Sequence, residues 1–174
     1  MQIPRPIRHR GVAEESSIPT VRKAMILGSV WRGIKGGLVA TIVMTVFRLP
    51  MFRALPPTAE FWATYLGEKP AEAYQFHGLV LHVVYGSMAG AAFGPVFAIA
   101  NRHYPGNRNY LALLTGLIYG VILSLIGTRL IFPYLLREDL QEDEALVFHV
   151  GHIIYGLTLG MWFGTHARAG EVYD

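Results

Sequence analysis

The sequence predicts an all-α integral membrane protein with four transmembrane helices, arranged as two parallel-repeat hairpins plus a short amphipathic interfacial helix. Two observations carry this prediction. The chain has 174 residues, of which 52% are hydrophobic and only 16% charged, with a mean hydropathy of +0.35. This is more apolar than an ordinary soluble domain. In addition, one pattern of histidine, tyrosine and glycine occurs twice.

The repeated pattern reads His-x-x-Tyr-Gly, followed by two further glycines at four-residue steps. It starts at His82 and again at His152. Residues four apart share one face of a helix, so each copy forms a ridge of glycines on which another helix can pack closely. An interior glycine costs roughly 1 kcal/mol relative to alanine in a helix in water, but close packing drives helix association in lipid. We expect six glycines to serve helix packing: Gly86, Gly90, Gly94, Gly156, Gly160 and Gly164.

Residues 1–30 are rich in arginine and proline, and we expect them to form a basic cytoplasmic tail. They lack the apolar core and cleavage site of a signal peptide. Two interpretations stand for residues 20–31: a solvated segment that sets topology, or a short helix at the membrane surface.

The rest of the chain, residues 31–174, is expected to be a single four-helix transmembrane domain. The first hairpin covers about 33–100 and the second about 116–165. Gly33 and Gly37 match Gly116 and Gly120, and the duplication therefore covers whole hairpins. Two-helix units insert with the same orientation, which predicts a parallel repeat about an axis along the membrane normal. We expect the spans over residues 33–50, 75–100, 116–133 and 145–165.

Two loops lie on the side opposite to the basic residues. The first contains a predicted short helix, residues 58–66, with Phe61, Trp62 and Tyr65 suited to the lipid headgroup region. The second is acidic, over residues 137–144. Basic residues cluster in the N-terminal tail, in the turn with Arg102, and in the C-terminal tail with Arg168. The positive-inside tendency then predicts a multi-pass protein of the inner (cytoplasmic) membrane with both termini cytoplasmic.

His82 and His152 are the main candidates for a cofactor site, because polar groups so deep in a span should face the bundle interior. The first interpretation needs no cofactor: the imidazoles hydrogen-bond across helices, to threonines or to tyrosines. The threonine and tyrosine candidates are Thr45, Thr128, Tyr85 and Tyr155. The second makes the pair axial ligands of a haem b. The third is a metal site joined by His149, three residues before His152, although no carboxylate within the spans supports it.

Arg48 and Arg129 lie near the ends of the first and third spans. Each is a candidate to bind an anionic lipid headgroup, a quinone carbonyl or a neighbouring subunit, or else extends to the interface. Four helices cannot turn every glycine ridge inward at once, so some ridge surface is expected to remain for partner helices. Nothing indicates nucleic acid, and the pI of about 9.3 follows from the basic loops.

Several segments resemble small four-span bacterial and archaeal membrane proteins of unknown function, broadly similar to the YagU-like group. The resemblance covers about residues 33–164, and its most specific elements are Ala-Thr-x-x-Met-Thr and His-x-x-Tyr-Gly. It implies the four-span fold and no activity.

These features predict a non-catalytic structural or accessory subunit of a larger membrane assembly, an electron-transfer or respiratory complex. Its partners would be other integral membrane subunits and membrane lipids. Two alternatives stay open: a bis-histidine haem b membrane anchor, and a small-solute carrier. The carrier is weakened because the spans contain no Asp or Glu for proton coupling. Whether the chain is an enzyme is left open, with the lack of catalytic carboxylates arguing against it.

Overall fold

The computed structural model describes residues 18–50, 57–104, 106–137 and 139–166. Most of the predicted N-terminal tail, and the C-terminal tail with Arg168, lie outside these residues. The described part is helical and contains no strand, which confirms the all-α prediction. Its elements are α1 (Ile18–Arg48), α2 (Thr58–Tyr65), η1 (Ala71–Tyr74), α3 (Gln75–His103), α4 (Arg108–Ile126), η2 (Gly127–Leu136) and α5 (Glu142–Thr165).

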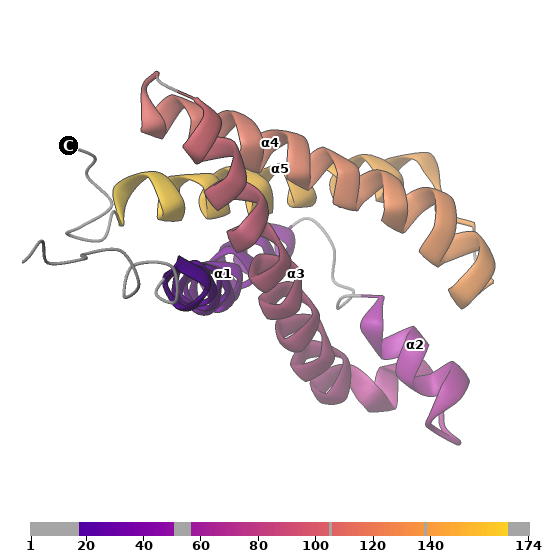
Figure 1. Cartoon of the computed structure of the whole chain (residues 1–174). Helices are drawn as coiled ribbons and strands as arrows, with labels where there is room; N and C mark the ends of the chain where they lie inside the picture. Colours follow the sequence, from indigo (N-terminus) through magenta and orange to yellow (C-terminus); the bar gives the residue numbers. More distant parts are fainter. Residues whose placement is uncertain (1–17, 51–56, 105, 138, 167–174) are drawn as a thin grey trace, which may run out of the picture.

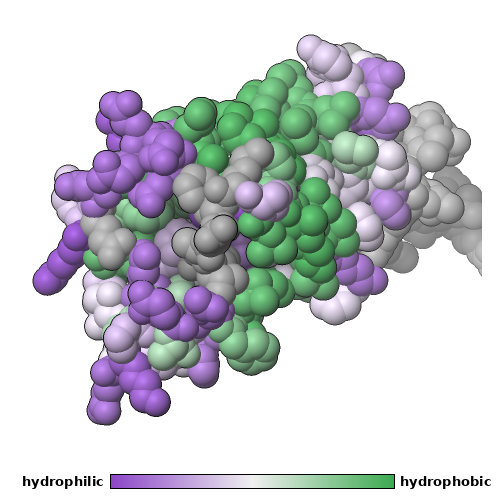
Figure 2. Space-filling view, turned by 180° about the vertical axis from the view of Figure 1, so that it is seen from behind, coloured by the Kyte–Doolittle hydropathy of each residue, from purple (hydrophilic) through white to green (hydrophobic). Residues whose placement is uncertain are grey.

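Four helical stretches are long and apolar enough to cross a membrane. A span needs about 20 residues, and these have between 23 and 33. Figure 2 shows a broad apolar band on the surface, with hydrophilic residues on both sides of it. The fold is therefore that of a multi-pass membrane protein. The four stretches are Ile26–Arg48, Ala71–His103, Arg108–Leu136 and Glu142–Thr165.

Helix α1 is longer than the first predicted span. Its backbone is helical from Ile18 and continues for 31 residues to Arg48. The segment 20–31, interpreted from sequence as a solvated tail or a separate surface helix, is thus the beginning of the first spanning helix. No proline lies between Thr20 and Arg48, so no missing backbone donor interrupts the helix there.

The helices pack as two close pairs, α1 with α3 and α4 with α5 (Figure 1). The pairs are joined mainly by α1 along α5, whereas α3 and α4 contact each other less. Helix α5 therefore lies between two long neighbours. Helix α3 has α1 on one side and the short helix α2 beside its first turns.

Glycines allow the close approach of the helices in both pairs, α1 with α3 and α4 with α5. A methyl group on Gly37 would overlap the carbonyl oxygen of Gly86, and one on Gly116 would overlap that of Gly156. The two backbones are thus in direct contact, as small residues allow in membrane helices. In these contacts Gly37 occupies the place of Gly116, so the sequence match of Gly33 with Gly116 is offset by about one helical turn.

The ridge glycines all pack within the chain. Added methyl groups on them would meet atoms of α1 on one side of the molecule and of α4 on the other. The expected surplus of ridge surface for partner helices is therefore not found in the described structure. The α3 ridge meets α1 and the α5 ridge meets α4: Gly86, Gly90 and Gly94, then Gly156, Gly160 and Gly164.

The third span ends later than predicted, because the chain continues past Ile126 as a ten-residue π-helix, η2. Pro133 lies inside this segment rather than at its end. The π-helix stops at Leu136, and Arg137 takes a left-handed conformation with φ 58° and ψ 36°. π-Helices are rare, and most occur as single-turn bulges within α-helices, frequently at functional sites.

The acidic loop is shorter than predicted, since α5 already begins at Glu142. Three acidic residues, Glu142 to Glu144, form the first turn of α5, where negative charge is favourable next to the helix N-terminus. Gln141 and Glu144 also form a capping box. Capping thus explains why these charges belong to the helix.

Candidate ligand-binding cavity

A cavity of about 270 Å³ lies at the α2 end of the molecule, where α2, η2 and the first turns of α5 meet. All five α-helices and η2 contribute residues to its wall. Most of its lining is aliphatic or aromatic. Its polar lining residues are Arg48, Thr58, His82, Tyr85 and His152. An apolar cavity with a few convergent polar groups is the usual form of a small-molecule site.

The π-helix η2 forms a large part of the apolar wall, through Ile131, Phe132 and Leu136. Gly127 lets α5 approach, because a methyl group there would overlap the ring of Phe148. The rings of Phe132 and Phe148 then meet edge to face, with centroids 5.3 Å apart. This contact between rings depends on the π-helix η2 and was not predicted from the sequence.

Helix α2 closes one side of the cavity. Thr58 Oγ1 donates a hydrogen bond of 2.6 Å to the carbonyl of Gly78 on α3. At the other end of α2, the hydroxyl of Tyr65 donates to the carbonyl of Leu135 on η2. Phe61, expected among lipid headgroups, lines the cavity instead. The predicted short helix is thus present, and it is bonded to both neighbouring walls.

Arg48 is the one charged side chain among the described lining residues. It lies in the last turn of α1 and is partly buried. No carboxylate lines the described cavity, and no described residue forms an ion pair with Arg48. Arg129, the other predicted candidate, is exposed on η2 and does not line the cavity. The same roles were predicted for both arginines from the sequence. In the structure, Arg48 lines the cavity and Arg129 does not.

His82 and His152 are brought together: both are buried, at 7% exposure, and both line the cavity. Nδ1 of His152 lies 2.9 Å from the carbonyl oxygen of Phe148. A carbonyl only accepts, so Nδ1 donates and Nε2 of the neutral ring is an acceptor. Nε2 of His82 is buried and has no described partner.

The predicted hydrogen bonds across helices are replaced by others. The described bond of His152 stays within α5, Thr128 donates to Ser124 O at 3.0 Å, and Thr45 Oγ1 is buried without a described partner. It is His149 that bonds across helices, with its Nδ1 3.0 Å from Ser124 Oγ. Histidine does link helices here, but the residue is His149, which lies three residues before the repeated motif.

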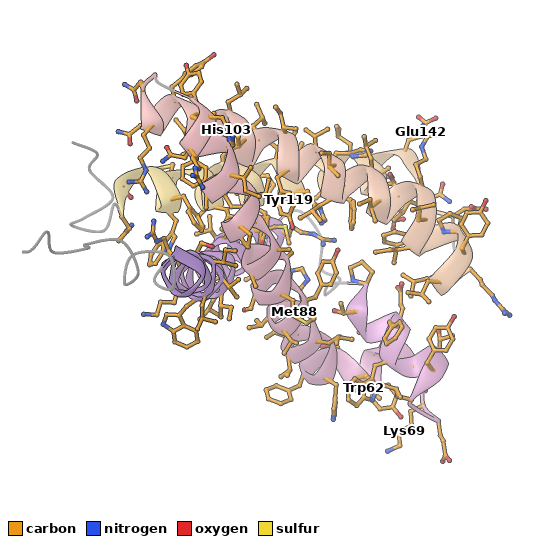
Figure 3. All side chains as sticks on the ribbon, viewed as in Figure 1. Trp62, Lys69, Met88, His103, Tyr119 and Glu142 are labelled. Carbon is orange, nitrogen blue, oxygen red and sulfur yellow. The ribbon has the colours of Figure 1, made fainter. Side chains whose placement is uncertain are left out.

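Two tyrosines connect α3 to the other pair. The hydroxyl of Tyr155, on α5, donates to Gly86 O at 2.6 Å in a buried position. Tyr119, on α4, donates to Ala89 O at 2.8 Å (Figure 3). The carbonyls they use lie just beyond His82 along α3. Tyr119 was not singled out from the sequence, because its motif, Gly-x-x-Tyr-Gly, lacks the repeated histidine.

The cavity suits neither a metal ion nor a haem of ordinary size. No group of three or more potential ligand side chains occurs within the described ranges, and His149 is engaged with Ser124. Ligand pockets usually measure about 300–1,000 Å³, and this cavity, at about 270 Å³, lies just below that range. A porphyrin between His82 and His152 would require the helices to separate.

The fold and the cavity together define a multi-pass, all-α membrane protein with a small, mostly apolar cavity. Over residues 27–172 the chain matches a family of unknown function, DUF6789, and it belongs to that family. No curated protein and no solved structure matches the chain.

Proposed function

We propose that this protein is a non-catalytic membrane subunit that binds one small amphipathic molecule in the cavity at the α2 end. The observation that carries the proposal is the cavity itself, in which Arg48, His82 and His152 converge within an apolar wall. Such a wall takes up the apolar body of a ligand, while the few polar groups orient its head.

The lining supports binding more than catalysis. Neither imidazole has an orienting carboxylate in the described lining, and the Thr58 hydroxyl is bonded to a backbone carbonyl. A nucleophile paired with an activating base, which covalent catalysis needs, is not found among the described lining residues.

The setting we propose is a larger assembly in the inner membrane, an electron-transfer or respiratory complex, with other membrane subunits and lipids around the helices. The lack of a nucleophile–base pair among the described lining residues supports an accessory role. Basic residues at the α3–α4 turn, Arg102 and Arg108, support cytoplasmic termini by the positive-inside tendency.

We also propose that the two helix pairs are parallel repeats and that α2 is an amphipathic interfacial helix. The repeat is supported by the equivalent crossings of Gly37 with Gly86 and of Gly116 with Gly156. The exposed Tyr65 supports the interfacial position of α2. The likeness to the YagU-like group rests on the shared Ala-Thr-x-x-Met-Thr and His-x-x-Tyr-Gly elements.

A second candidate is a haem b anchor, favoured by one feature of the histidines. Metal-ligating histidines usually donate their other ring N–H to a carbonyl or carboxylate, as His152 does to Phe148. Nε2 of His82 is also without a described partner. The cavity volume argues against this candidate, and a reduced-minus-oxidised absorption spectrum of the purified protein decides it: a b-type band lost in both His→Ala variants would establish the haem.

The test of ligand binding is native mass spectrometry of the full chain, purified in mild detergent. We expect one bound amphiphile per chain. Leu123→Trp, which fills the cavity, should remove it, and Leu125→Trp, on the exposed face of the same helix, should retain it. The proposal fails if the wild type carries no ligand and takes up none, or if both variants behave alike. Co-purifying subunits, identified in the same preparation, test the proposed assembly.

A further inference from the structure

We infer that the occupant of the cavity carries an anionic oxygen head, a carboxylate or a phosphate, on a single apolar chain, and that Arg48 binds this head. The inference rests on the proposed function, because it specifies the chemistry of the molecule that fills the same cavity.

Arg48 is positively charged and partly buried at the cavity. A guanidinium that is partly buried among apolar side chains loses much of its hydration, and charges in membrane proteins are normally paired. Arg48 has no described ion-pair partner, and no Asp or Glu lines the described cavity. Arg129 is exposed and does not line the cavity. Arg48 thus lacks a counter-ion that an anionic ligand would supply, with the bidentate geometry that guanidinium offers to carboxylate and phosphate.

A second polar group, the His82 imidazole, lines the same cavity as Arg48. Nε2 of His82 is buried and has no described partner, and an unbonded buried polar atom is unfavourable by about 1–3 kcal/mol. In the tautomer with hydrogen on Nε2, His82 donates to an oxygen. A carboxylate or phosphate has enough lone pairs to accept from Arg48 and from His82 together. A neutral alcohol offers fewer acceptor sites and no charge.

The cavity is small and partly open. Its volume of about 270 Å³ admits a head and the first part of one chain, rather than a lipid with two chains. Two lining residues, Tyr85 and Leu135, are also exposed, at 39% and 40%, so the cavity is open beside them. A chain can therefore leave the cavity at these residues and continue into lipid. The occupant fits a fatty acid or a lysophospholipid.

The test compares three ligands of equal chain length on the purified full-length protein: oleate, oleyl alcohol and oleoyl lysophosphatidic acid. Binding is measured with radiolabelled ligand in detergent at fixed ionic strength. We expect the wild type to bind one or both anions at least tenfold more tightly than the alcohol. The better of the two anions distinguishes a fatty-acid carboxylate from a lipid phosphate.

Three variants assign the preference to Arg48. Arg48→Gln should reduce the preference for the anion to less than threefold while alcohol binding persists, and Arg48→Lys should keep most of the preference. Arg129→Gln is the matched control and should behave as the wild type. Equal binding of alcohol and anions by the wild type, or an unchanged preference in Arg48→Gln, would overturn the inference and leave the proposed function standing. If the wild type binds none of the three ligands, both the inference and the proposed function are wrong.

Discussion

The His-x-x-Tyr-Gly segments of α3 and α5 are nearly the same in sequence and very different in surroundings. Tyr155 on α5 is 2% exposed and donates to Gly86 O, whereas Tyr85 on α3 is 39% exposed and lines the cavity. His152 bonds the carbonyl of Phe148, whereas Nε2 of His82 has no described partner. Helix α5 lies between α1 and α4, and α3 lacks an equivalent second long neighbour.

The difference shows that the helices packed against each copy, rather than the motif itself, determine the role of its histidine and tyrosine. In α5 the tyrosine is a structural link between the helix pairs. In α3 the same residue type is left facing a space that α2 and η2 enclose. The cavity, and with it the proposed binding site, is thus located where the packing of the two copies differs.

The largest effect is expected where the copies are alike, at the glycine crossings. Gly37→Leu and Gly116→Leu should each prevent the close approach of a helix pair, because the added side chain meets backbone that cannot move aside. Overpacking usually costs about 1–3 kcal/mol, and these contacts with backbone should exceed that range. The measurement is the yield of monodisperse protein and its Tm. Gly164→Ala, where the nearest atom to the new methyl is 3.2 Å away, is the control and should stay near wild type. If only one of the two leucine variants loses stability, the two crossings are not equivalent.

A smaller effect should separate the two tyrosines. Tyr155→Phe removes a buried hydrogen bond between helix pairs, and such bonds in membranes contribute about 0.6–1.7 kcal/mol. Tyr85→Phe should leave stability within about 0.5 kcal/mol, as expected for a side chain without a structural contact, and should alter ligand binding instead. Reversible unfolding in detergent and the binding assay measure the two effects. Equal losses of stability in both variants would contradict the comparison.

The smallest effect is expected at His149. Ser124→Ala removes its partner on α4 and should lower stability by about 0.6 kcal/mol, the average for such bonds. Because we assign His149 to a hydrogen bond rather than to a metal, the Tm of the wild type should not change when EDTA is added. A fall in Tm with EDTA, restored by one divalent metal, would replace this assignment with a metal site.

Much of the fold could be predicted from the sequence, and the site only in part. The spacing of glycines and apolar residues predicted four long helices, and the depth of His82 and His152 predicted that both face inward. The π-helix could not be predicted, because Pro133 reads as a helix end when only α-helical geometry is considered.

The two arginines illustrate the same limit. Arg48 and Arg129 have similar positions near the ends of their spans, and the sequence offers no reason to prefer one. Arg48 is part of a cavity only because residues of α2, α3, η2 and α5 line the same space near the end of α1. The difference between Arg48 and Arg129 depends on contacts between segments that are far apart in the chain. The periodicity of residues within one segment cannot predict such contacts.

The central claim is that the cavity holds a small amphiphile with its head at Arg48. A crystal structure of the protein grown from a lipidic mesophase, with oleate present, tests it most directly. The account predicts density for one chain that lies along Phe132 and Leu136, with its head within hydrogen-bonding distance of the Arg48 guanidinium. A cavity filled by the protein's own side chains, or a ligand bound with its head away from Arg48, would contradict the account.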